Sequence, residues 1–150
     1  MPQSLSNILV HLVFSTKNRE HMLVKNIRDE LHGYISGIVE NLGGLLMKAG
    51  SVEDHIHLLL VLPRTCSPAD LVKEIKTGTN TWLKEQGEIW HNFHWQSGYG
   101  MFSISQNHKE AVMEYIANQE EHHKTVTFQE EYRRLLKKNG VNFDERYVWD

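Results

Sequence analysis

The stretch Asp54–Leu62, DHIHLLLVL, has the pattern of a buried strand that begins with two histidines. Successive side chains on a strand point to opposite faces, so His55 and His57 share one face. Ile56 and Leu58 point the other way, into a predicted core. Two imidazoles on one face can bind neighbouring positions of a metal ion. With 10 histidines in 150 residues, about 0.7 such pairs are expected by chance, so the pair needs support from elsewhere in the chain.

Composition predicts one soluble domain spanning residues 1–150. The hydrophobic fraction is 40% and the charged fraction 23%, as in ordinary globular proteins. No apolar run approaches the ~20 residues needed to cross a bilayer, and the N-terminus has no signal-peptide pattern. The single cysteine, Cys66, excludes an internal disulfide and a cysteine-rich zinc site. We therefore expect a cytoplasmic protein.

The charge pattern argues against a protein that coats DNA non-specifically. The formal net charge is −3, whereas such proteins are usually basic. A local basic patch is still compatible with binding a short nucleic-acid segment. Lys17 and Arg19, in a polar loop, and Lys73 and Lys76, on a helix, are the candidate phosphate contacts, although the loop could equally be a solvated connection.

The order of the predicted elements indicates an α+β fold. Helical periodicity over 25–42 ends at a glycine pair, Ser67 and Pro68 open the next helix, and Thr127 begins a capping box. The order β-α-β-β-α-β predicts a ferredoxin-like, four-stranded antiparallel sheet with helices on one face and additional C-terminal helices. In that arrangement the histidine strand is central. The predicted strands are 8–14, 45–52, 55–62 and 95–105, and the predicted helices are 25–42, 68–86, 106–124 and 128–138.

A second group of residues could complete a site beside the histidines. Tyr115 and Gln119 are four residues apart on a predicted helix, so they share a face. The Gln119 carbonyl could be a third metal ligand, which would leave the phenol of Tyr115 close to the metal without binding it. A phenol has an ordinary pKa of about 10 and needs help to lose its proton. No base for that step is evident from the sequence.

Three blocks of the sequence carry a family pattern. At residues 54–59, 95–103 and 115–119 they read DHIHLL, WQSGYGMFS and YIANQ. In this order and spacing they resemble the IS200/IS605-family transposases, also called single-tyrosine (Y1) HUH transposases. The resemblance runs over nearly the whole chain, as far as the Tyr115 helix, and there is no departure from it at the histidine pair, Tyr115 or Gln119.

The resemblance implies a small homodimer that binds hairpin ends of single-stranded DNA. Such enzymes cut one strand with the tyrosine, form a 5′-phosphotyrosine and a free 3′-hydroxyl, and then rejoin strands. It assigns the nucleophile to Tyr115 and the ligands of Mg²⁺ or Mn²⁺ to His55, His57 and Gln119, with the tyrosine helix sometimes supplied by the partner. Imidazole ligands generally suit transition metals better than magnesium, and this ligand set is neutral.

Two other functions are compatible with the sequence. The chain could be a domesticated relative that binds hairpin DNA or RNA without cutting, or a metal-dependent hydrolase of a small phosphodiester. The intact Tyr115 argues against the first, and the hydrolase would need a base near His55. Among the remaining histidines, His11 is expected to be a packing residue and 120–123 a solvated helix end, with a role behind the ligands open for His123.

Overall fold

A four-stranded antiparallel sheet forms the centre of the computed structural model, which describes residues 2–150. The strand order is β2-β3-β1-β4, so the histidine strand β3 is central, as predicted. Register places His57 opposite Val13 on one side and Gly50 on the other. The strands are β1 (Leu9–Ser15), β2 (Leu45–Ser51), β3 (His55–Val61) and β4 (Gly100–Ile104).

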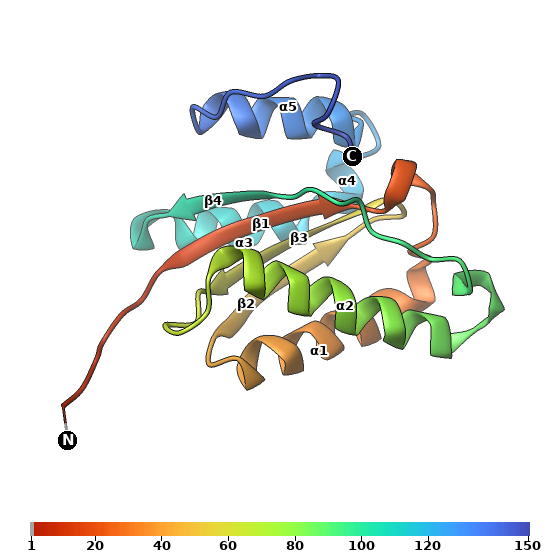
Figure 1. The fold of residues 1–150 in the computed structure, drawn as a ribbon. Coiled ribbons are helices and arrows are strands. Elements are labelled where there is room, and N and C mark those ends of the chain that lie inside the picture. The colour runs from red at the N-terminus through yellow and green to blue at the C-terminus, as the bar shows by residue number, and fades with distance from the viewer. Residues whose placement is uncertain (1) are drawn as a thin grey trace.

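Two long helices cover one face of this sheet (Figure 1). They are α1 (Lys25–Asn41) and α2 (Pro68–Gln86). Their apolar stripes pack on the side chains of β3 and β1 that point away from the histidine face, and together these residues form the main core. Gly43 adopts a φ of 94°, the left-handed conformation that ends α1. The Ser67 hydroxyl accepts a hydrogen bond from the Asp70 N–H at the start of α2. The ferredoxin-like prediction is confirmed by this arrangement.

The C-terminal helices cover the opposite face, the one onto which the histidines point. Ile116 packs on Leu9 and Leu59, and Phe128 and Tyr132 belong to a second cluster. None of the helices in residues 2–150 combines the length and apolarity required to cross a membrane. The remaining elements are α3 (Lys109–Ala117), α4 (Gln119–His122), α5 (Phe128–Lys138) and the short 3₁₀ helices η1 (Lys17–Arg19), η2 (Glu88–Trp90) and η3 (Gln106–His108).

The helix predicted over 106–124 is not continuous. It begins as η3 and breaks at Asn118, whose φ and ψ are −99° and 20°, before α4 resumes. Asn is a weak helix former, and its side chain competes for backbone hydrogen bonds. The break has a consequence for the site, because Gln119 follows it directly and its side chain is 2% exposed.

The strand predicted over 95–105 is shorter than its pattern suggests. Only Gly100–Ile104 pairs continuously with β1, and Trp95 makes an isolated bridge with Thr16. The backbone between them finds other partners: Lys76 Nζ donates to the carbonyls of residues 96–98. Gly100 is needed where β4 begins, because a Cβ there would lie 2.6 Å from a ring carbon of Tyr132.

Candidate active site

His55 and His57 lie side by side on β3, with both side chains completely buried and ring centroids 5.1 Å apart. Each imidazole has one nitrogen held by a neighbour. His55 Nδ1 lies 2.7 Å from Asp54 Oδ1, and His57 Nδ1 lies 2.8 Å from His11 Nε2. Partners of this kind fix ring orientation and leave the other nitrogen for a ligand. The Nε2 atoms of both rings therefore face the same space.

A carboxylate from α5 fills that space. Glu131 is 1% exposed, although a charged side chain is almost never fully buried without partners. Its Oε1 lies 2.8 Å from His57 Nε2, 3.0 Å from His123 Nε2 and 3.2 Å from His55 Nε2. One carboxylate oxygen thus meets three imidazoles that come from β3 and from the segment after α4.

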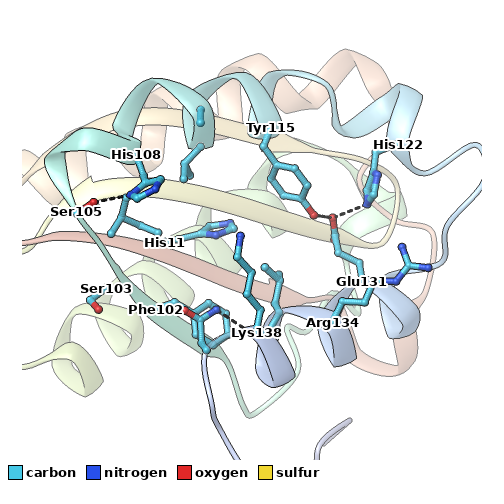
Figure 2. A pocket seen from close by; sticks show the side chains of 15 residues that line it. His11, Phe102, Ser103, Ser105, His108, Tyr115, His122, Glu131, Arg134 and Lys138 are labelled. Carbon is cyan, nitrogen blue, oxygen red and sulfur yellow. Dashed lines mark hydrogen bonds and ion pairs between the residues drawn. The ribbon is translucent and has the colours of Figure 1, made fainter.

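The second oxygen of Glu131 connects the same cluster to Tyr115. The Tyr115 hydroxyl donates a hydrogen bond to Glu131 Oε2, and Gln119 Nε2 donates to the same oxygen at 3.2 Å. His122 Nε2 also lies 3.2 Å from Oε2. Figure 2 shows this ion pair beside the tyrosine. Gln119 Oε1 lies 3.3 Å from His55 Nε2. The four residues predicted from sequence therefore meet in one place, within a single chain.

The electrostatics of the cluster favour a negative Glu131. Burial alone would raise the pKa of this carboxyl, but hydrogen bonds from His123, His55 and His57 outweigh burial and hold it far below the usual range. The pKa of His55 is raised to about 8, because contacts with Asp54 and Glu131 exceed the effect of burial. Burial lowers the pKa of His57 to about 4. Burial and the Glu131 charge raise the pKa of the Tyr115 phenol.

The donor set fits a divalent metal ion. One ligand atom from each of His55, His57, His123 and Glu131 can be chosen so that all four lie within 4.8 Å of one another. Imidazole nitrogens and carboxylate oxygens are ligands of zinc and of other divalent first-row metals. The amide oxygen of Gln119 adjoins the same space, so the ligand predicted from sequence is also in reach.

A groove of about 550 Å³ runs from the Tyr115 phenol along the edge strand β4. Its lining is mostly apolar and includes Phe102 of β4 and Val112 of α3, while α5 contributes two cations, Arg134 and Lys138, to its wall. Figure 2 shows Lys138 extending towards His11. The complete lining is His11, Phe102, Ser103, Ile104, Ser105, His108, Ala111, Val112, Tyr115, His122, Glu131, Arg134, Leu135, Lys138 and Asn139.

Comparison with known proteins identifies the family. The sequence matches the family described as "Transposase IS200 like" over residues 4–119. The chain belongs to the IS200-like transposase family. Within it, the ISDra2 transposase TnpA of Deinococcus radiodurans is 28% identical over 117 residues, which cover 73% of this chain and 81% of that protein.

Solved structures share the fold of this family member. A crystal structure described as a transposase from Deinococcus radiodurans R1 superposes with a TM-score of 0.61 and 24% identity, over 79% of this chain and 98% of that one. A REP-associated tyrosine transposase bound to a REP hairpin superposes with a TM-score of 0.62 and 16% identity, over 84% of this chain and 74% of that one. At these identities the likeness establishes the α+β architecture.

The family match ends at Gln119, so α5 lies outside it. His122, His123 and Glu131, which surround the predicted ligands, therefore belong to a part of the chain that the family pattern does not describe. The sequence contained one signal for Glu131: it falls between Phe128 and Tyr132, on the apolar stripe of an amphipathic helix. An acidic residue on a stripe that packs into the core indicates that its carboxylate has a buried partner, because charged side chains are rarely buried alone.

Two structural findings correct expectations about histidines. His11 packs in the sheet as expected, but its ring also bonds to His57 and so belongs to the site. The end of the tyrosine helix is not a solvated segment at His122 and His123, because both rings face Glu131. The helix break at Asn118 turns this segment inward, a change that uninterrupted helical periodicity did not anticipate.

The four cations predicted to contact phosphate lie away from the groove. Lys73 and Lys76 are on α2, which covers the other face of the sheet, and Lys76 Nζ is bonded to three backbone carbonyls. Arg19 donates to the Trp149 carbonyl at 3.2 Å. Lys17 and Lys73 are exposed. The groove cations lie on α5 instead.

Acid is expected to destabilise the metal-free protein through His11. Burial, reinforced by His57, lowers the pKa of His11 to about 3, from about 6.5 when unfolded. The unfolded chain binds more protons, so this stabilisation is complete above pH 6.5 and is lost as pH falls towards 3. At pH 5 the loss is about 2 kcal/mol.

Urea unfolding in the presence of a chelator, at pH 7 and pH 5, measures this effect. The His11→Leu variant should show a smaller pH dependence than wild type by about 2 kcal/mol. The exposed His91→Ala change serves as the control and should leave the dependence unaltered. An equal pH dependence in all three proteins would contradict a neutral, buried His11.

Proposed function

We propose that this chain is a transposase that binds hairpin ends of single-stranded DNA and cuts and rejoins one strand through Tyr115. The observation that supports this most directly is the meeting of the Tyr115 phenol with the His55–His57 pair in a member of the IS200-like family. A neighbour in fold is bound to a REP hairpin. The proposed ion is Mg²⁺ or Mn²⁺, held by His55, His57 and Gln119.

The proposed reaction is a phosphoryl transfer to and from the phenol. Tyr115 Oη attacks phosphorus, the O–P bond to tyrosine forms, and the bond to the 3′ oxygen breaks and leaves a 3′-hydroxyl. The phenolic proton leaves along its hydrogen bond to Glu131 Oε2 and passes to solvent, while the departing 3′ oxygen takes up a proton from solvent. In the second step a 3′-hydroxyl loses its proton to solvent as its oxygen bonds to phosphorus, the bond to tyrosine breaks, and the tyrosine oxygen takes up a proton, which restores the phenol. The covalent intermediate keeps the ester energy, so no nucleotide cofactor is required.

The surrounding side chains control the protonation state of the nucleophile. Burial and the Glu131 carboxylate raise the pKa of Tyr115, so the phenol stays protonated while it is bonded to Glu131. When bound, a divalent cation would polarise the scissile phosphate and add positive charge beside this carboxylate. Asp54 orients the His55 ring through a hydrogen bond to its Nδ1 atom, and His11 orients the His57 ring in the same way.

We place the single strand next to the scissile phosphate in the groove along β4. The groove opens at the Tyr115 phenol, and Arg134 and Lys138 give its α5 wall the charge that phosphates require. Its apolar side chains can contact a base or sugar, as in other single-strand channels. Lys17, Arg19 and Lys73 stay candidate contacts for the hairpin.

The paired change Arg134→Ala and Lys138→Ala is expected to weaken binding of a hairpin that carries a single-stranded extension. Each lost phosphate contact should reduce the slope of log K against log salt by about 0.7. Fluorescence anisotropy between low and physiological salt measures this slope. Lys137→Ala, an exposed change on the same helix, should behave like wild type. An unchanged slope in the double variant would exclude the groove as the path of the strand.

A non-cleaving, hairpin-binding protein that acts on DNA or RNA is the second candidate. The observation in its favour is that the Tyr115 hydroxyl is already engaged by Glu131, which disfavours the phenolate. Such a protein would bind hairpins with any divalent ion and never form a covalent product. A hydrolase of small phosphodiesters has no comparable support.

The oligomeric state and location remain predictions. Family resemblance implies a homodimer, and a tyrosine helix exchanged between subunits would give a composite site. Here the phenol reaches the histidine pair of its own chain, so cleavage in cis is the simpler arrangement. A cytoplasmic location remains the expectation.

Adduct formation tests the proposed function. The full chain is mixed with Mn²⁺ or Mg²⁺ and a labelled single-stranded oligonucleotide that carries a hairpin end, and the products are separated on a denaturing gel. The expected result is a slower, metal-dependent protein–DNA band that a chelator prevents. Stable hairpin binding without this band, for every hairpin and metal tested, would favour the non-cleaving alternative.

A further inference from the structure

We propose that Glu131 is a metal ligand and nucleophile-positioning residue, supplied by a helix outside the matched part of the family. This inference rests on the proposed function, since it concerns the same site. Glu131 Oε1 would bind the ion with His55 and His57, while Oε2 holds the Tyr115 hydroxyl beside it. One residue on α5 would thus connect the metal to the nucleophile.

Distances around Oε1 support its role as a ligand. It lies 2.8–3.2 Å from the Nε2 atoms of His57, His123 and His55. Neighbouring ligand atoms around a four-coordinate ion with 2.0–2.1 Å bonds are separated by about 3.3 Å. Oε1 is therefore already near ligand spacing from each of the three nitrogens, and the four donor atoms, which lie within 4.8 Å of one another, would draw closer around an ion. His123 is the fourth donor of this cluster.

Charge supplies a second argument. A set of two histidines and one glutamine is neutral, and neutral nitrogen-rich sites suit Mg²⁺ or Mn²⁺ poorly. Adding the Glu131 carboxylate gives the site a negative, oxygen ligand of the kind these ions prefer. A bound cation would also compensate the negative charge of the Glu131 carboxylate, which is 1% exposed and therefore costly to bury.

The position of α5 is well determined by packing. Phe128, Tyr132 and Leu136, on the stripe around Glu131, are buried against Val13 and Phe102 of the sheet. The Thr127 hydroxyl caps the helix by accepting from the Glu130 N–H at 3.2 Å. A carboxylate on a packed, capped helix can hold ligand geometry more closely than one on a loop.

Gln119 has a defined part in this arrangement. Its Nε2 donates to Glu131 Oε2 at 3.2 Å, while its Oε1 faces His55 Nε2. The side chain can thus orient the carboxylate and still offer an oxygen to the same ion. Loss of Gln119 should consequently weaken metal binding less than loss of Glu131.

Metal titration of the full chain, without DNA, tests the inference. Isothermal titration with Mn²⁺ and visible absorption with Co²⁺ are compared for wild type, Glu131→Gln and Glu130→Gln. Partners behind ligands already contribute 10–100-fold to metal affinity in known sites, so Glu131→Gln should lose about 10-fold or more. Glu130 is an exposed neighbour, and its variant should bind like wild type.

Two further measurements keep the result interpretable. Thermal melting of the chelated variants checks folding, and Glu131→Asp, which keeps the charge, should recover part of the Co²⁺ spectrum even if Glu131→Gln is unstable. A metal affinity that is unchanged or increased in folded Glu131→Gln would overturn the proposal, because it would show that Glu131 occupies the metal position without binding the ion. Failure of wild type to bind Co²⁺ would also overturn it.

The inference and the proposed function fail in different ways. Wild type that binds metal through Glu131 but forms no covalent adduct would refute transposition and leave the ligand assignment intact. Adduct formation together with wild-type metal affinity in Glu131→Gln would do the opposite. The two experiments are therefore run on the same preparations.

Discussion

Replacing Tyr115 by phenylalanine is expected to abolish the covalent protein–DNA adduct while hairpin binding stays close to wild type. The change removes the single oxygen that is proposed to attack phosphorus, and no covalent route remains without it. The ring can keep its position, since it contacts His11 and His57 edge-on. The adduct is scored on a denaturing gel and binding by anisotropy.

The fold is expected to tolerate this change. Glu131 Oε2 loses one hydrogen bond but keeps Gln119 and His122 as neighbours, so the cost in unfolding free energy should be about 1 kcal/mol. Tyr147→Phe, at a side chain that is 64% exposed, is the matched control and should form the adduct normally. An adduct that survives Tyr115→Phe would show that another residue is the nucleophile.

Replacing His57 by asparagine is expected to reduce adduct formation by about 10³-fold and to weaken Mn²⁺ binding in parallel. Metal assistance contributes several kcal/mol to phosphoryl transfer, and each 1.36 kcal/mol is tenfold in rate. His57 is also the closest imidazole to Glu131, at 2.8 Å. Its loss removes a ligand and one of the donors that hold the carboxylate.

Rates of single-turnover cleavage, measured over a range of Mn²⁺ concentrations, test this prediction. If His57 binds the ion, a higher Mn²⁺ concentration should partly restore the rate of the variant. His91→Ala is the control, because His91 is exposed and lies outside the cluster. A His57→Asn protein with unaltered metal affinity and cleavage would refute the role of the histidine pair.

Local patterns were sufficient to predict most of the fold. Alternation in β3, the apolar stripe of α1 and the caps at Ser67 and Thr127 each depend on a few neighbouring residues, and the element order then selects the topology. The cluster of His55, His57, Tyr115 and Gln119 came from spacing together with family resemblance. The structure brings these four side chains together, while their roles stay proposals.

Features that depend on contacts distant in sequence could not be predicted. Glu131 reaches the histidines only because α5 folds back over the sheet, and it is 74 residues from His57. No local sequence pattern around either residue predicts that the two are in contact. Likewise, the 95–100 segment has a strand-like composition, but Lys76 binds its carbonyls and thereby removes it from the ladder.

Peptide mapping of the covalent adduct tests the central claim most directly. Trypsin releases residues 110–124 as one peptide, in which Tyr115 is the single tyrosine. Mass spectrometry of a nuclease-trimmed adduct should find a nucleotide joined through its 5′-phosphate to Tyr115, formed only when a divalent metal is present. A nucleotide on any other residue, or a cut strand with a free 5′-phosphate and an unmodified protein, would contradict the account.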